Sequence, residues 1–357
     1  MDNASCAGLH LLRLNHEDRA ANRVKKECKG RQCMGKYKVV MLDCIFPDTK
    51  VEEEILKEID ADLILSPSTD ESTLVQYVSD ADAIVTSYVQ VTEKILKAAK
   101  RCKIVVRTGI GVDAIDVPAA TRLGMYVANV PDFCFDEVSD HTLALVLALQ
   151  RKIKILDQKV RKGAWGTHEV KPIFGLKGQT YGLVAFGNIA RFVAKKAQVF
   201  GFKMIATDPF VSPEEAKKFG VELVEFDKLL EASDVISIHA PLLKSTYHMF
   251  NEKTIGRMKN TTYLVNVGRG GLVDQEALYN ALMSGTIAGA ALDVMEEEPP
   301  KTNEPLFTLD NVIITGHTAW YSESSIIERR KKFSREIVAT LKGGRPKNWV
   351  NREQKGN

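Results

Sequence analysis

The sequence predicts an α/β protein with two doubly wound domains, each a parallel sheet covered by helices on both faces. The chain has 357 residues, which is more than a single core usually serves. From Tyr37 onward, short runs rich in Val, Ile and Leu alternate with segments of helical periodicity, as in a parallel sheet. This alternation stops at a long helical stretch and then begins again, so we expect a second domain of the same class.

The strands of the first domain are expected at KVVML (38–42), ADLIL (61–65), AIVTS (83–87), KIVVR (103–107) and MYVAN (125–129). The segments between them are VEEEILKEI, ESTLVQYV, TEKILKAA and DVPAATRLG, which have the apolar spacing typical of helices. Asn129-Val130-Pro131 follows the last strand. We expect a hinge there, because a proline restricts the residue before it to extended geometry.

The second domain is expected to begin with a long helical stretch from about Phe133 to Gly163, followed by a glycine-rich arm. Its strands are predicted at YGLVA (181–185), KMIAT (203–207), DVISI (234–238), TYLVN (262–266), AGAAL (288–292) and NVIIT (311–315). Roughly six strands fit a doubly wound nucleotide-binding domain. The last helical stretch, residues 322–344, could pack on either domain.

Composition and charge exclude several classes of function. Lys and Arg number 49 against 46 Asp and Glu, so the formal net charge is only +3, and it is not concentrated in one block. We therefore expect no nucleic-acid partner. No apolar run approaches the roughly 20 residues that span a bilayer, so no membrane segment is predicted. The six cysteines lack metal-ligand or disulfide spacing, which favours free thiols, a cytoplasmic location and no bound metal.

Residues 1–35 differ from the rest of the chain and predict a disordered extension. They contain neither a sustained apolar period nor the apolar core of a secretory signal. The segment GKYKVVMLD after Met34 would make a sensible beginning for the folded protein.

The segment LVAFGNIAR (183–191) resembles a dinucleotide-binding turn in which Ala185, Gly187 and Ala190 occupy the three glycine positions. A strand precedes it and a helix is expected from Asn188, as such a turn requires. Gly187 lets the backbone approach a pyrophosphate, and Ala190 is small enough for helix packing. Ala185 is the main departure, since a positive φ there would cost on the order of 1–2 kcal/mol. The alternative is a structural turn that binds no nucleotide.

Asp208 ends the next predicted strand, about twenty residues after the turn, where a carboxylate contacts the ribose 2′-hydroxyl. A carboxylate repels a 2′-phosphate, so NAD is favoured over NADP. This residue favours nucleotide binding over a purely structural turn.

Three charged clusters follow later strands. Arg269 lies among glycines in NVGRGGLVD, where its guanidinium could hold a carboxylate, although a surface arginine is the common alternative. Glu296, Glu297 and Glu298 precede prolines, and His317 follows directly after a strand in IITGHTAW. A carboxylate beside an imidazole favours its protonated form and fixes its tautomer, which suits a proton donor, whereas an isolated histidine is more often structural. With a hydride-carrying cofactor, this set predicts interconversion of 2-hydroxy and 2-keto acids.

From Tyr37 to Asn351 the sequence resembles the D-isomer-specific 2-hydroxyacid dehydrogenases. The resemblance rests on VVRTGIGVDAIDVPAATRLGMYVANVP, VSDHTLALVLAL, the 180–208 segment, NVGRGGLVDQEALYNALMSGTIAGAALDVMEEEP and GHTAWYSE. The ending HTAWYSESSI…GRPKNWVN is most similar to the C-terminal-binding-protein branch, whose members keep this fold and bind NAD.

The resemblance implies a role for each matching residue. The catalytic set is Arg269, which holds the substrate carboxylate, His317, the general acid/base, and its partner Glu298. The implied cofactor-binding residues are Gly187, Asn188, Ile189, Asp208, His239, Pro241, Thr246, Val267 and Asp293. The implied substrate-binding residues are Arg107, Gly109, Ile110 and Trp320.

The resemblance also implies a discontinuous arrangement of domains. Residues 36–131 and 320–351 would form a flavodoxin-like substrate domain, and residues 132–319 an NAD-binding Rossmann domain. The active site would lie between them, and residues 133–178 would join two copies in a homodimer. The substrate would be a small 2-keto or 2-hydroxy acid. The alternative from the same resemblance is an NAD(H)-responsive dimeric adaptor with little or no turnover.

Overall fold

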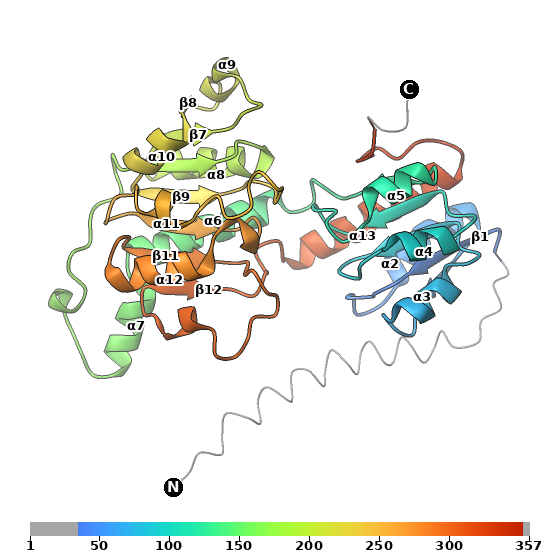
Figure 1. Ribbon diagram of the computed structural model, residues 1–357, viewed down its shortest axis with the longest axis horizontal. Coiled ribbons are helices and arrows are strands. Elements are labelled where there is room, and N and C mark those ends of the chain that lie inside the picture. The colour runs from blue at the N-terminus through green and yellow to red at the C-terminus, as the bar shows by residue number, and fades with distance from the viewer. Residues whose placement is uncertain (1–34, 353–357) are drawn as a thin grey trace, which may run out of the picture. The chain divides into compact units, whose positions relative to one another are not determined.

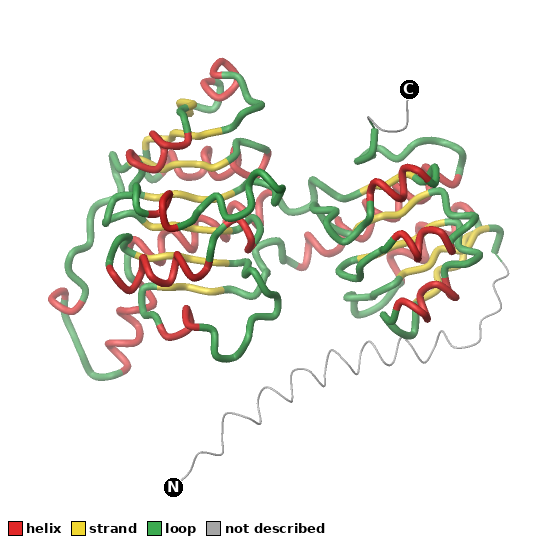
Figure 2. Tube along the Cα trace, in the orientation of Figure 1, coloured by secondary structure: helices red, strands yellow, loops and turns green. Residues whose placement is uncertain are grey.

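The computed structural model describes residues 35–352, so the extension predicted for residues 1–35 lies, except for Gly35, outside the described residues. The chain divides into two compact units. Unit 1 contains the residues up to Phe133 and those from Glu323 onward, and unit 2 is Cys134–Ser322. Each unit is a single parallel sheet with helices packed against it (Figure 1 and Figure 2), which confirms the predicted fold class.

Unit 1 is built on a five-stranded parallel sheet in the order β2-β1-β3-β4-β5, the flavodoxin-like order. Its strands are β1 (Tyr37–Met41), β2 (Ala61–Leu65), β3 (Ala83–Thr86), β4 (Ile104–Arg107) and β5 (Tyr126–Ala128). Its helices are α2 (Lys50–Leu56), α3 (Glu71–Tyr77), α4 (Glu93–Ala98), α5 (Val117–Arg122) and α13 (Glu323–Leu341), with a 3₁₀ turn at Lys57–Ile59. Helices α3, α4 and α5 bury their apolar residues in one cluster against the sheet.

The C-terminal helix α13 belongs to unit 1, which decides between the two packings that the sequence left open. It packs against α2 and contacts β4. Phe333 of α13 stacks on Phe46, with 6.1 Å between ring centroids. Arg330 of the same helix pairs with the fully buried Glu52 of α2. The chain therefore returns to unit 1 after completing unit 2.

Unit 2 is built on a seven-stranded parallel sheet in the order β12-β11-β10-β9-β6-β7-β8. Its strands are β6 (Thr180–Val184), β7 (Lys203–Thr207), β8 (Val221–Leu223), β9 (Val235–Ile238), β10 (Tyr263–Asn266), β11 (Gly289–Leu292) and β12 (Val312–Ile314). Six of these were predicted, and the edge strand β8 was missed. It has only three residues, and the exposed Glu222 in its middle interrupts any apolar run.

The helices of unit 2 are α6 (Phe135–Gln150), α7 (Ile153–Arg161), α8 (Asn188–Val199), α9 (Pro213–Lys217), α10 (Phe226–Ala232), α11 (Glu252–Ile255) and α12 (Gln275–Ser284), with 3₁₀ turns at Thr167–Glu169, Gly270–Leu272 and Pro305–Thr308. Helices α6 and α8 cover one face of the sheet, and α10, α11 and α12 cover the other. The single helical stretch expected from Phe133 to Gly163 is instead broken between α6 and α7, where Lys152 has a left-handed φ of 52°.

The order of the strands marks the place where a ligand is expected in unit 2. Chain order reverses between the neighbouring strands β6 and β9, and ligands of open α/β sheets bind outside the carboxyl ends of the strands at such a point. The N–H of His239, just after β9, donates to the carbonyl oxygen of Val184, the last residue of β6. The two strand ends are therefore held side by side. In the described part of the chain, none of the helices combines the length and apolar character needed to cross a membrane.

Candidate active site

The turn predicted to bind a nucleotide lies between β6 and α8 and contains a left-handed residue at its first glycine position, although it retains only one glycine. Ala185 has a φ of 65°, so the left-handed conformation that normally requires glycine is held here by an alanine. Gly187 caps α8, and a Cβ added there would meet open space. A ligand could therefore approach the backbone of Gly187 closely. Asn188 and Ile189 begin the helix, whose N-terminal N–H groups favour an anion. Ala190 is fully buried, as a helix-packing position requires.

Asp208 lies just beyond β7 and is oriented by the backbone on both sides. Its Oδ2 accepts the N–H of Phe186 at 2.8 Å, and its Oδ1 accepts the N–H of Phe210 at 2.8 Å. The first bond ties the carboxylate directly to the nucleotide turn. Each oxygen keeps a further lone pair, so a ribose hydroxyl can still donate to it.

The loop after β9 contains the residues implied on the adenine side. Burial lowers the pKa of His239 to about 3, so its ring is neutral, and its Nε2 lies 2.7 Å from Oγ of Ser237. Oγ1 of Thr246 donates to the carbonyl oxygen of Pro241 and accepts the N–H of Leu243, both at 2.8 Å. Thr246 therefore orders this loop from within. Contacts of these residues with a cofactor stay predictions.

Arg269 lies in a turn that a buried asparagine organises. Oδ1 of Asn266, the last residue of β10, accepts the N–H of Gly268, and its Nδ2 donates to the carbonyl oxygen of Arg269. The guanidinium of Arg269 donates to the carbonyl oxygen of Gly268 at 2.8 Å. Val267 packs against the apolar cluster beneath the sheet. Sequence reasoning missed Asn266, although a buried polar residue at a strand end could have signalled it.

Glu298 and His317 form a hydrogen-bonded pair, with Oε2 of the glutamate 2.7 Å from Nδ1 of the histidine. Burial tends to raise the pKa of Glu298, but the bond from His317, the N–H of Met295 and the nearby charge of Arg269 together lower it below the usual value. Glu298 is thus influenced by both of the other residues predicted to be catalytic. Because Nδ1 is occupied, Nε2 is the nitrogen left for proton transfer.

Asp293, implied as a cofactor contact, is 2% exposed at the end of β11. Its carboxylate accepts the N–H groups of Thr318 and Ala319, on the turn that carries His317. Trp320 follows this turn and packs edge-on against Tyr321, with 5.7 Å between ring centroids. The substrate contact predicted for Trp320 stays a prediction.

Unit 1 carries the other implied substrate residues at the carboxyl end of β4. The guanidinium of Arg107 lies 5.9 Å from the ring centroid of Tyr88 and folds over Gly109, where a Cβ would clash with it. The carbonyl oxygen of Ile110 accepts a bond from Nδ2 of Asn129. Asp43, which the sequence did not indicate, supports the neighbouring loop by accepting the N–H groups of residues 87–89.

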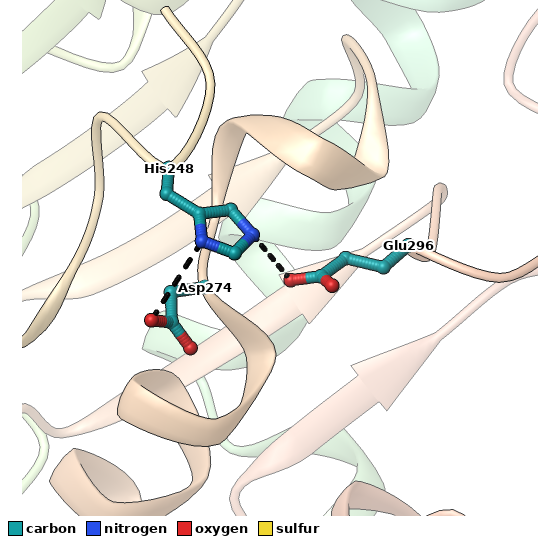
Figure 3. A group of neighbouring side chains, drawn as sticks. All are labelled: His248, Asp274 and Glu296. Atoms are coloured by element: carbon teal, nitrogen blue, oxygen red, sulfur yellow. Dashed lines mark ion pairs between the residues drawn. The ribbon is translucent and has the colours of Figure 1, made fainter.

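A second charged cluster of unit 2 was not predicted (Figure 3). Nε2 of His248 lies 3.0 Å from Oε1 of Glu296, and Nδ1 lies 3.8 Å from Oδ2 of Asp274. These residue types can bind metals, and their donor atoms lie within 4.8 Å of one another. However, the two carboxylates face opposite ring nitrogens, so an ion on one nitrogen would have only one carboxylate beside it. The arrangement is therefore an imidazole flanked by a carboxylate on either side, and it does not by itself indicate a metal site.

Several known proteins are similar to this chain in both sequence and fold. Residues 143–319 match the model of the D-isomer specific 2-hydroxyacid dehydrogenase, NAD binding domain. A glyoxylate reductase of Korarchaeum cryptofilum is 36% identical over 318 residues, which are 87% of this chain and 96% of that protein. The chain belongs to the D-isomer specific 2-hydroxyacid dehydrogenase family. The predicted family is thereby confirmed.

Two further comparisons cover other parts of this dehydrogenase family. A D-3-phosphoglycerate dehydrogenase of Archaeoglobus fulgidus is 40% identical over 281 residues, which are 78% of this chain and 53% of that protein. This chain thus spans about half the length of that relative. The crystal structure of a D-lactate dehydrogenase from Aquifex aeolicus, complexed with NAD and lactic acid, matches with a TM-score of 0.77 and 30% identity over 85% of this chain and 96% of that one.

Residues 143–319, which make up most of unit 2, match the NAD-binding domain of this dehydrogenase family, and their chemistry fits that cofactor. Gly187 leaves open space in front of a twelve-residue helix, and the carboxylate of Asp208 is bonded to the same turn. Both features suit a pyrophosphate and an unphosphorylated ribose.

Proposed function

We propose that this chain is an NAD-dependent oxidoreductase that interconverts a small 2-keto acid and a D-2-hydroxy acid. The pair formed by Glu298 and His317, with the charge of Arg269 acting on it, is the observation that carries the proposal. The relatives named glyoxylate reductase and D-lactate dehydrogenase support the same class of substrate.

Each residue of the pair has a distinct part in proton transfer. Glu298 accepts the Nδ1 proton of His317, which fixes the tautomer and stabilises the imidazolium. His317 then donates its Nε2 proton to the carbonyl oxygen during reduction and removes it during oxidation. Arg269 supplies a planar, permanently charged group that holds the substrate carboxylate. When bound, NADH supplies the hydride. The substrate contacts of Arg107, Gly109, Ile110 and Trp320 remain part of the proposal.

A screen of NADH oxidation with glyoxylate, hydroxypyruvate, pyruvate and longer 2-keto acids tests this function. The matched variant is His317→Asn, because asparagine tolerates the left-handed φ of 55° found at this position. We expect His317→Asn to lower kcat by about 10²–10⁴-fold, with the Kd for NADH retained. Unchanged turnover would remove His317 from the mechanism. Tight NADH binding without turnover of any keto acid would favour the adaptor function instead.

We also propose a homodimer joined through the arm that follows α6. Four large apolar side chains of this arm are exposed, namely Ile153, Val160, Trp165 (81% exposed) and Phe174. Exposed apolar groups can mark protein interfaces when they gather in a patch. Analytical ultracentrifugation of the Trp165→Ser variant tests the proposal, which predicts a weakened dimer. A cytoplasmic location remains a prediction.

A further inference from the structure

His317 is held in a backbone conformation that a histidine does not adopt without support. Its φ is 55°, in the left-handed region. Such a conformation costs about 1–3 kcal/mol and persists only where the surroundings impose it. The direction of the imidazole follows from this backbone, so whatever holds the turn also aims the ring at Glu298.

Asp293 supplies most of that support. Its carbonyl oxygen accepts the N–H of His317 at 2.7 Å, its Oδ1 accepts the N–H of Thr318 at 2.9 Å, and its Oδ2 accepts the N–H of Ala319 at 3.0 Å. Three consecutive backbone donors therefore converge on one residue. Because Asp293 is buried, these bonds are shielded from water, and both carboxylate oxygens accept a backbone N–H.

A third hydrogen bond to the carboxylate of Asp293 comes from Thr315 and leads to a second histidine. Oγ1 of Thr315 donates to Oδ1 of Asp293 at 2.6 Å. The same hydroxyl lies 3.0 Å from Nε2 of His141. A hydroxyl has one proton, which Thr315 gives to Asp293, so its oxygen must accept from the histidine. Nε2 of His141 therefore carries a proton.

His141 reaches this carboxylate only through the threonine. Its Nε2 is 3.6 Å from Oδ1 of Asp293, beyond hydrogen-bond distance. The ring projects from α6, a sixteen-residue helix whose buried Val138, Thr142 and Leu145 fix it against the sheet. A rigid helix thus orients the Thr315 hydroxyl, which in turn orients the carboxylate that holds the His317 turn.

We propose that His141 is a positioning residue of the dehydrogenase, which aims His317 through Thr315 and Asp293. The inference rests on the proposed function, because that function gives His317, the residue being positioned, its catalytic role. Without the bond from His141, the hydroxyl of Thr315 has one restraint fewer, and the Asp293 carboxylate then depends mainly on the N–H groups of Thr318 and Ala319 for its direction. The imidazole then leaves its alignment with Glu298, while the nucleotide turn after β6 is untouched.

Two pairs of variants test this chain of bonds. His141→Leu and Thr315→Val remove the polar contacts with little change in size, whereas His141→Gln and Thr315→Ser retain a donor and a hydroxyl. We expect each of the first pair to lower kcat by about tenfold, the effect of one lost buried hydrogen bond, with the Kd for NADH unchanged. His141→Gln and Thr315→Ser should each keep most of the wild-type kcat. The double variant His141→Leu/Thr315→Val should be no slower than Thr315→Val alone, because the two residues act in series.

Other outcomes overturn the proposal. If His141→Leu lowers the melting temperature without changing kcat, His141 has only a structural role. If Thr315→Val weakens NADH binding while kcat is kept, the network serves the cofactor. A readout independent of turnover is the ring NMR signal of His317, assigned with His317→Asn in ¹⁵N-histidine-labelled protein. This signal should shift in His141→Leu and return in His141→Gln, and an unshifted signal would refute the positioning. If the wild type reduces no keto acid, the proposed function fails, while the NMR comparison still tests the positioning.

Discussion

Oε2 of Glu298 lies 2.7 Å from Nδ1 of His317, while Oε1 of the same carboxylate accepts the N–H of Met295 at 3.0 Å. Both oxygens are thus fixed, one by the backbone of its own loop and one by the imidazole. The pair joins the loops that follow the neighbouring strands β11 and β12. Its geometry is therefore set by the sheet.

This pair should make stability depend on pH in acid. The pKa of Glu298 is lower in the folded protein than its usual value. The resulting stabilisation is fully present above the unfolded pKa of glutamate, about 4.3, and is lost as the pH falls through the folded pKa. The difference in urea midpoint between wild type and Glu298→Gln should therefore shrink between about pH 5 and pH 3. The exposed neighbour Glu297 provides the control variant Glu297→Gln, and a difference independent of pH would contradict this linkage.

The left-handed Ala185 predicts that a glycine is better tolerated there than alanine. Ala185→Gly should relieve roughly 1–2 kcal/mol of strain, against about 0.5–1 kcal/mol of added chain entropy, so the urea midpoint should rise slightly. Ala190→Gly, inside α8, should lower it instead. For NADH we expect a modest change in Kd. A gain of more than about a hundredfold, or ~2.7 kcal/mol, would show that the alanine turn impairs cofactor binding.

Asp208 should determine the preference for NADH over NADPH. Asp208→Asn keeps the shape and one acceptor oxygen for the backbone but removes the negative charge that repels a 2′-phosphate. The Kd for NADPH divided by the Kd for NADH, both measured by nucleotide fluorescence, should fall at least about tenfold, since apposed like charges cost several kcal/mol. Glu222→Gln, at an exposed site on β8, is the matched control and should leave the ratio unchanged. An unaltered ratio in Asp208→Asn would exclude a role in ribose selection.

The sequence was sufficient for the features that depend on local pattern. Buried strands can be recognised in the sequence as short apolar runs. Arg269, Glu298 and His317 could be predicted to lie near one another because each follows a strand at the same edge of a sheet. The break at Lys152 could not be predicted, because Arg151 and Lys152 are good helix formers and tertiary packing decides their backbone.

The relationships between distant residues were also hidden from the sequence. Asp293 was associated with the cofactor by resemblance, which stays a prediction, and its bonds to the His317 turn depend on the register of β11 and β12. His141 is 174 residues from Thr315 in the chain, so no spacing connects them. The burial of Arg330 could not be predicted either, because a charged residue in an amphipathic helix normally lies at the surface.

Arg330 gives the sharpest prediction for stability. Its Nε donates to Oε1 of Glu52 at 2.7 Å, and its terminal nitrogen donates to Oε2 at 2.6 Å and to Asp48 at 2.9 Å. The side chain of Glu52 is 0% exposed and that of Arg330 only 5%. Arg330→Met would therefore leave the carboxylate of Glu52 buried without its partner, at a cost of about 3–5 kcal/mol.

The same helix contains the matched control for this variant. Arg335 pairs with Glu58, but both side chains are exposed, so Arg335→Met should leave the urea midpoint almost unchanged. The double variant Arg330→Met/Glu52→Met should recover much of the loss, because a packed apolar pair can replace a buried ion pair. Urea unfolding followed by tryptophan fluorescence measures all three. Equal effects of Arg330→Met and Arg335→Met would show that the buried pair does not hold α13 on unit 1.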